Sequence, residues 1–159
     1  MNIKIISVGK IKEKYLRDGI DEYAKRLSRY CKLSFIQVPD EKTPDGASEA
    51  EESSIRNVEG ERILRHIKEV DYVISLAIEG KMLNSVELSR HIEQLGIRGI
   101  SNISFVIGGS LGLSSNVLKK SNEQLSFSPM TFPHQLFRIM LTEQIYRAFT
   151  ILNHQTYHK

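Results

Sequence analysis

The sequence predicts an α/β fold with a mostly parallel sheet and helices on both faces. Segments with the periodicity of strands alternate with segments of helical periodicity, which is typical of that class. The most apolar segment, residues 103–107, is rich in β-branched and aromatic residues and is polar only at Ser104. This pattern indicates a strand covered on both faces. A glycine-rich turn over residues 108–112 follows at once, and ligands of open α/β sheets bind beyond such strand ends.

Length and composition favour one soluble domain. The chain has 159 residues, of which 40% are hydrophobic and 26% are charged; this is enough for a core without disulfides. We therefore expect a single domain over residues 1–159. The only cysteine, Cys31, excludes an internal disulfide and fits a reducing cytosol. Because no leader pattern opens the chain and no apolar run approaches roughly 20 residues, we predict a cytoplasmic protein without a membrane partner.

The first half of the chain contains two predicted strands, each followed by a helix. Apolar residues alternate in the first strand and recur at helical spacing in the amphipathic segment after it. Ser48 is expected to cap the second helix, whose first turns hold three glutamates that suit the positive end of the helix dipole. The expected ranges are 2–8 (strand), 12–30 (helix), 33–38 (strand) and 49–68 (helix).

The second half repeats this alternation with shorter elements. The chain is expected to turn away from its third strand at residues 79–81. Asn84 and Glu87 form a capping box for a helix that Gly96 is expected to end. The last helix carries an apolar stripe broad enough to predict burial against a partner subunit. The expected ranges are 71–78 (strand), 85–95 (helix), 103–107 (strand), 116–120 (helix, capped by Ser114 or Ser115), 124–127 (strand) and 133–153 (helix).

Charge is distributed unevenly along the chain. Residues 1–38 carry nine Lys or Arg against four acids, residues 39–71 carry five against ten, and residues 103–159 carry five against two. Two basic segments around an acidic middle are compatible with a phosphate-binding face. A non-catalytic RNA-binding module is therefore one alternative function for the chain.

The glycine-rich turn also matches the nucleophile elbow of serine hydrolases. Gly108-Gly109-Ser110-Leu111-Gly112 fits the pattern G-x-S-x-G between a strand and a helix. A triad of that fold needs an acid and then a histidine downstream, and the only acids after Ser110 are Glu123 and Glu143. A serine esterase is thus the second alternative, with an incomplete triad.

Other cofactor motifs are missing from the sequence. The dinucleotide pattern G-x-G-x-x-G is absent, and no Lys followed by Ser or Thr completes a phosphate loop. The histidines show no metal-ligand spacing with Cys31 or with one another, so we expect no metal site.

Three segments of the chain resemble a known enzyme family. They are Phe105-Val-Ile-Gly-Gly-Ser-Leu-Gly-Leu113, Leu125-Ser-Phe-Ser-Pro-Met-Thr-Phe-Pro-His-Gln-Leu-Phe-Arg138 and the terminal Tyr157-His158-Lys159. Together with the chain length and the opening Ile-Lys-Ile-Ile-Ser-Val-Gly-Lys10, they are similar to the ribosomal large subunit pseudouridine methyltransferase H family. The resemblance covers the whole chain.

The resemblance implies a fold, an activity and a set of site residues. The family belongs to the SPOUT class, which binds S-adenosylmethionine in a C-terminal trefoil knot and acts as homodimers. It methylates N3 of a pseudouridine in 23S rRNA and acts on assembled ribosomes. The positions that match its cofactor contacts are Leu76, Gly108, Phe127, Ser128, Pro129, Met130, Thr131 and Phe132. A cofactor of this kind needs apolar walls, backbone partners and little positive charge nearby.

Methyl transfer to an N–H nitrogen needs alignment of the reacting atoms and a place for the proton to go. In the family-like terminal segment, His158 is our first candidate for the general base, with Tyr157 and Lys159 orienting the base or holding phosphate. His134 is the second candidate. Deleting the last three residues is expected to remove no core side chain.

Overall fold

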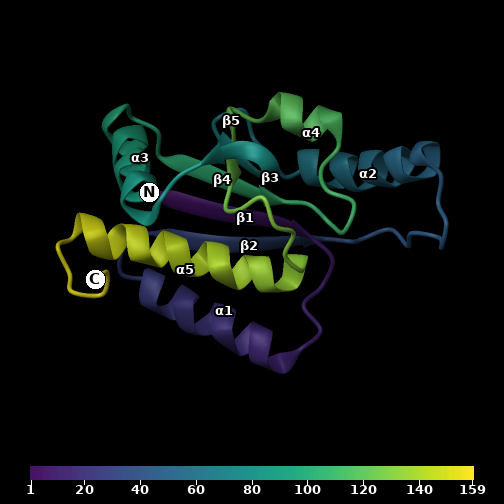
Figure 1. The fold of residues 1–159 in the computed structure, drawn as a ribbon. Coiled ribbons are helices and arrows are strands. Elements are labelled where there is room, and N and C mark those ends of the chain that lie inside the picture. Colours follow the sequence, from purple (N-terminus) through teal and green to yellow (C-terminus); the bar gives the residue numbers. More distant parts are fainter.

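The computed structural model describes residues 1–159 and contains one five-stranded sheet in the order β2-β1-β4-β3-β5, with every pairing parallel (Figure 1). The predicted α/β class is confirmed. In chain order the elements are β1 (Asn2–Val8), α1 (Lys14–Leu27), β2 (Lys32–Val38), α2 (Glu49–Leu64), β3 (Tyr72–Met82), α3 (Ser85–Ile97), β4 (Asn102–Ile107), α4 (Ser115–Lys120), β5 (Glu123–Ser126) and α5 (His134–Leu152).

Alternate residues of the central strands build two cores, one on each face of the sheet. Ile3 and Ile5 of β1 belong to the larger core, which α1, α3 and α5 complete, whereas Ile6 and Val8 belong to a smaller core under α2 and α4. Figure 1 shows α1 and α5 on one side of the strands, and α2 and α4 on the other. Because β4 is buried on both faces of the sheet, its sequence is an almost continuous apolar run. None of the helices combines the length and the apolar character that a bilayer crossing requires.

Local capping chemistry is confirmed at three helix starts. The side chain of Ser48 accepts a hydrogen bond from the Glu51 amide, and Ser114 does the same for the Val117 amide. Asn84 and Glu87 form the complete capping box. Each bond satisfies an amide that has no partner within its helix.

Two predicted boundaries in the second half are wrong. Gly96 lies inside α3, which ends instead at Ile97; Gly99, just beyond the C-cap, has a φ of +83°, and the Ile100 amide donates to the Leu95 carbonyl. A left-handed glycine just after the last turn is the usual helix ending. Residues 79–81 do not end β3, which continues to Met82 after an irregularity.

The apolar stripe of α5 packs mainly within its own chain. Its buried members are Leu141, Ile145, Tyr146, Ala148 and Phe149, all in the larger core. The breadth of the stripe is therefore explained by the sheet and by the neighbouring helices α1 and α3. Leu136, by contrast, is 39% exposed near the start of the helix.

Candidate functional site

A cavity of about 740 Å³ lies beyond the carboxyl ends of β3, β4 and β5. These strands are neighbours in the sheet, so loops that are far apart in sequence converge on one edge. The cavity is lined by seven of the eight residues that were predicted to contact the cofactor: Leu76, Gly108, Phe127, Ser128, Met130, Thr131 and Phe132. Pro129 lies between two of them, is exposed, and does not line the cavity.

The glycine-rich turn after β4 forms one wall of this cavity through its backbone. Gly109 and Gly112 pair across the turn, and the Gly112 amide donates to the Gly109 carbonyl at 3.1 Å. A methyl group on Gly108 would lie 2.7 Å from the carbonyl carbon of Gly112. The turn thus needs a glycine at 108 for its own folding, and not only for the close approach of a ligand.

Helix α2 supports the back of the same turn. Glu59 is 5% exposed, and its Oε1 accepts a hydrogen bond from the Glu41 amide at 3.1 Å. Its other oxygen, Oε2, is buried without a partner, and a methyl group on Gly109 would lie 3.1 Å from it. Burial raises the pKa of Glu59, although the Glu41 amide opposes this shift. A buried carboxyl group therefore lies directly behind the turn.

The segment between β5 and α5 forms the opposite wall. The Ser126 hydroxyl donates to the Ser128 carbonyl, and the Ser128 hydroxyl accepts from the Met130 amide, which folds the segment into a compact turn. Phe127 packs on Phe137 of α5 with ring centroids 4.8 Å apart. Met130 is 70% exposed and is not a core residue. The wall combines an aromatic surface with backbone groups.

The electrostatic character of the cavity suits a sulfonium-bearing nucleoside. Among its 23 lining residues, 12 are hydrophobic and the only Lys or Arg is Arg56. His134 also lines the cavity. Burial, and then the neighbouring Arg138 cation, lower the pKa of His134, although Asp40 opposes this shift. Its imidazole is therefore neutral at neutral pH and adds no positive charge.

The esterase alternative gains no support from the geometry around Ser110. Ser110 lines the cavity, but no hydrogen bond joins its hydroxyl to a histidine, as a catalytic serine would require. Helix α4 begins only at Ser115, so Ser110 does not sit on the sharp strand-to-helix turn that exposes such a nucleophile.

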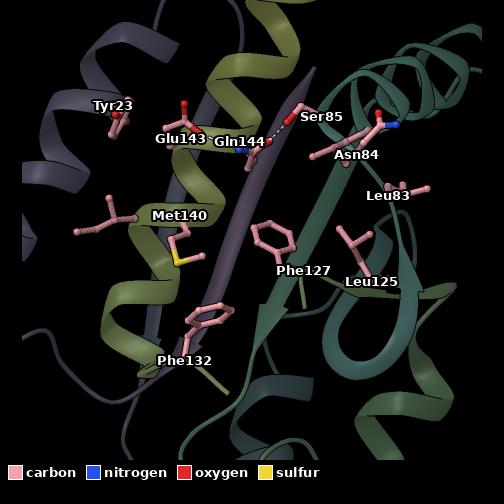
Figure 2. A pocket seen from close by; sticks show the side chains of 12 residues that line it. Tyr23, Leu83, Asn84, Ser85, Leu125, Phe127, Phe132, Met140, Glu143 and Gln144 are labelled. Carbon is pink, nitrogen blue, oxygen red and sulfur yellow. Dashed lines mark hydrogen bonds between the residues drawn. The ribbon is translucent and has the colours of Figure 1, made fainter. Parts of the chain in front are cut away.

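A second cavity, of about 490 Å³, shares Leu125, Phe127 and Phe132 with the first. Figure 2 shows Leu125 and Phe127 across from the α5 residues Met140 and Gln144, with Phe132 lying below Met140. Its polar groups come from the start of α3 and from the middle of α5, where the Ser85 hydroxyl donates to the Gln144 side chain at 2.8 Å. Glu143 also lines this second cavity.

The C-terminal segment folds back onto α5 beside the second cavity. The Tyr157 hydroxyl donates to Glu143 Oε1 at 3.0 Å, and its ring meets that of Tyr146 edge-on with centroids 4.9 Å apart. His158 Nδ1 lies 3.3 Å from Nη1 of Arg147. The expectation that the last three residues contribute nothing to the core is wrong, because Tyr157 packs against it. Lys159 is exposed.

The three predicted catalytic residues do not line the first cavity in this chain. They are Tyr157, His158 and Lys159, and only His134, the second candidate, is among its lining residues. Two residues that hold the C-terminal segment, Glu143 and Arg147, were not predicted from the sequence. Arg147 donates to Glu143 Oε1 from Nε and Nη2 at 3.0 and 2.5 Å. Their i, i+4 spacing on a helix was the available signal.

No group of three or more His, Cys, Asp or Glu side chains is arranged to hold a metal ion. The groups that the site offers to a ligand are the side chains and backbone atoms already described. They are the glycine turn, the aromatic segment 127–132, His134, and the ionic cluster of α5 and the C-terminal segment.

Comparison with known proteins identifies the family. A family model described as predicted SPOUT methyltransferase matches residues 1–158. The ribosomal RNA large subunit methyltransferase H of Clostridium botulinum (strain Eklund 17B / Type B) is 64% identical over 159 residues, which is 100% of both chains. The protein of the same name from Clostridium tetani is 62% identical, again over 100% of both chains.

Two solved structures share the fold at low sequence identity. A probable methyltransferase from Bordetella pertussis Tohama I superposes with a TM-score of 0.57 at 13% identity, covering 92% of this chain and 95% of that one. A probable methylase family protein from Haemophilus influenzae Rd KW20 gives 0.54 at 13% identity, covering 99% and 70%. On its match to the family model and its full-length relatives, the chain belongs to the SPOUT methyltransferases, in the ribosomal RNA large subunit methyltransferase H family.

Proposed function

We propose that this protein transfers a methyl group from S-adenosylmethionine to N3 of a pseudouridine in 23S rRNA, and that it acts in the cytoplasm on assembled ribosomes. The observation that carries the proposal is the first cavity, where the loops after β3, β4 and β5 bring together the residues that match the family's cofactor contacts. The names of the full-length relatives support a large-subunit ribosomal RNA as the substrate.

The first cavity fits the proposed methyl donor in size and in chemistry. Its volume lies within the usual range of small-molecule sites, roughly 300 to 1,000 Å³. Phe127 and Phe132 supply an apolar wall for an adenine ring, and the backbone of the glycine turn supplies amide and carbonyl partners. S-adenosylmethionine supplies an electrophilic methyl group on sulfur. The chain's own part is to hold the donor, align it with the nucleotide and exclude water.

The N3 proton of the pseudouridine needs an acceptor, and two histidines are candidates. Arg147 has only donors, so in its contact with His158 the Nδ1 atom accepts. In the neutral ring the proton is then on Nε2, and His158 is a free base only after it leaves Arg147. His134 is neutral and already lines the cavity. We assign the base to His158, with Tyr157 and Lys159 beside it, and keep His134 as the alternative.

We further propose that the enzyme is a homodimer in which the C-terminal segment of one subunit completes the site of the other. Within one chain, Tyr157 is held at Glu143, about 13 Å along α5 from its first residue at a rise of roughly 1.5 Å per residue. Exposed apolar side chains near the first cavity, such as Met130 and Leu136, provide surface for a partner. The apolar stripe of α5 itself does not support this argument, because it is largely buried within the chain.

The trefoil knot of the SPOUT class is also part of the proposal. In β3, both Leu76 and Lys81 pair with Leu125 of β5, so residues 77–80 pass around one position of the neighbouring strand. A methyl group on Gly80 would lie 2.7 Å from backbone atoms of Gln124. The knot is proposed from the family match, and the irregularity shows only that β3 and β5 make close backbone contact at this edge of the sheet.

Mass spectrometry of ribosomal RNA tests the proposed function. The 23S rRNA of a deletion strain is expected to lack one methyl group on a pseudouridine. Purified protein and labelled S-adenosylmethionine should restore that group on isolated ribosomes, and to a smaller extent on protein-free 23S rRNA. A deletion strain with an unchanged set of modified nucleosides would contradict the proposal.

A further inference from the structure

Residues 10–17, which connect β1 to α1 and form its first turn, make an unusually basic exposed segment. Only one carboxylate, Glu13, lies within it. The Tyr15 side chain is 71% exposed. Three of the four cations, Lys10, Lys12 and Arg17, are in no ion pair, and the pair between Lys14 and Asp18 is largely solvent-exposed. The four exposed cations are Lys10, Lys12, Lys14 and Arg17.

The backbone of this basic segment is held in place by contacts with its neighbours. The Arg17 guanidinium donates to the carbonyls of Ile11 and Lys12 at 3.2 and 3.1 Å. The Lys12 amide donates to the Gln135 side chain at 3.2 Å. Beneath the segment, a small apolar cluster joins it to α5 through Ile11, Leu16, Ile20 and Ile139. The exposed side chains therefore project from an ordered backbone.

The basic segment lies next to the first cavity. Gly9, immediately before it, lies beside His134, because a methyl group on Gly9 would be in van der Waals contact with Nε2 of His134, at 3.6 Å. His134 lines the cavity, and the next residue, Gln135, bonds to Lys12. A polymer whose reacting base entered the cavity would therefore pass close to the lysines.

We propose that residues 10–17 bind the substrate RNA beside its reacting nucleotide, with the lysines on backbone phosphates and the Tyr15 ring stacked on an unpaired base. The inference rests on the proposed function and extends it to how the RNA is held. Unpaired lysines suit phosphates. An exposed aromatic ring among cations is the arrangement with which proteins bind single-stranded or looped RNA, because every base offers a face for stacking. An acidic polypeptide would satisfy the lysines but would leave the ring without such a partner.

Kinetics on isolated ribosomes test the role of the lysines. A variant that combines Lys10→Ala, Lys12→Ala and Lys14→Ala is expected to raise KM for ribosomes by on the order of tenfold or more. It should keep kcat and the calorimetric affinity for S-adenosylmethionine. The slope of log KM against log salt should fall by about one for each lysine that no longer binds a phosphate. The matched control combines Lys32→Ala with Lys68→Ala, two lysines outside the segment, and should behave as the wild type.

Tyr15 is tested with a pair of substitutions. Tyr15→Ala should raise KM for ribosomes on the order of tenfold, whereas Tyr15→Phe keeps the ring and should be close to the wild type. Wild-type KM and salt slope in the triple lysine variant would overturn the proposal, as would equal inhibition by polyglutamate and by single-stranded RNA of the same charge. If the wild-type protein methylates no ribosomal RNA at all, the proposed function itself fails, and this outcome is distinct from the others.

Discussion

The two cavities share a wall but present different chemistry to it. Leu125, Phe127 and Phe132 line both. The first cavity is bounded by the backbone of a glycine turn and has little charge. The second lies beside an ionic cluster in which Glu143 accepts from both Arg147 and Tyr157. One side of the wall thus offers an apolar surface with little charge, whereas the other lies beside a carboxylate that is bonded to a guanidinium and to a tyrosine hydroxyl.

This difference makes the two cavities separable by experiment. Substitutions at the glycine turn should change the binding of the methyl donor, and substitutions in the C-terminal segment should change its transfer. Binding measured by calorimetry and transfer measured on ribosomes therefore report on different sides of the shared wall.

The largest effect is expected from His158→Asn. Asparagine can still accept a hydrogen bond from Arg147 but cannot act as a base, so methyl transfer should fall by roughly a hundredfold. Affinity for S-adenosylmethionine should not change, and raising the pH should restore part of the rate by ionising N3 without help. His154→Asn is the matched control, because His154 is exposed and has a backbone φ of +53°, which asparagine tolerates. A full rate in the His158 variant would transfer the role to His134.

A smaller effect, and the opposite pattern, is expected from Gly108→Ala. The added methyl group must displace the backbone at Gly112, so the turn loses the geometry that faces the donor. Calorimetry should show an affinity for S-adenosylmethionine weaker by on the order of tenfold to a hundredfold, the scale of about 1–3 kcal/mol of steric strain. In Gly96→Ala the same methyl group would lie 3.4 Å from the end of the Met1 side chain, and affinity should be unchanged. Equal affinities in the two variants would show that the turn does not contact the donor.

The Tyr157 hydroxyl offers a milder test of the ionic cluster. Tyr157→Phe removes a hydrogen bond but leaves Glu143 paired with Arg147, so the free energy of unfolding should fall by only about 1 kcal/mol. The variant should keep its ring packed on Tyr146 and its affinity for the methyl donor. Tyr157→Ala also removes that ring and should lower the melting temperature further. If the two variants unfold at the same temperature, the ring does not stabilise the fold.

Much of the fold was predictable because its signals are local. Ser48, Asn84 and Ser114 cap helices that the sequence placed within a few residues, since a capping side chain needs only the next turn to act. The converging loops were predictable as well, because parallel strands end at the same edge of a sheet. Most of the positions predicted to contact the cofactor came from the family resemblance, and the structure brings seven of the eight together at the cavity.

The missed features depend on interactions between distant residues. The continuation of β3 around Leu125 is stabilised by pairing with a strand more than forty residues away, and no local pattern reports it. The packing of Tyr157 depends on Tyr146 and Glu143 of α5. The sequence predicted only the apolar stripe of that helix. The sequence predicted Gly108 as a place where a ligand approaches the backbone. The structure gives a second reason for a glycine at 108, because the backbone of Gly112 packs against it in the folded turn.

The smallest predicted effect concerns Glu59, the buried carboxyl behind the glycine turn. Because burial raises its pKa in the folded protein, the folded state favours the protonated form. The stability from this group is therefore fully present below the pKa of the unfolded chain, about 4.3, and is lost as the pH rises through the higher folded value. Glu59→Gln keeps an oxygen for the Glu41 amide and cannot ionise. It should match the wild type in melting temperature near pH 4 and melt about one or two degrees higher at pH 7. Glu61→Gln, an exposed neighbour on α2, should show no such pH-dependent difference. If Glu59→Gln is less stable than the wild type at pH 7, the carboxylate is ionised and paired in the folded protein. The negative charge behind the glycine turn would then stabilise the fold.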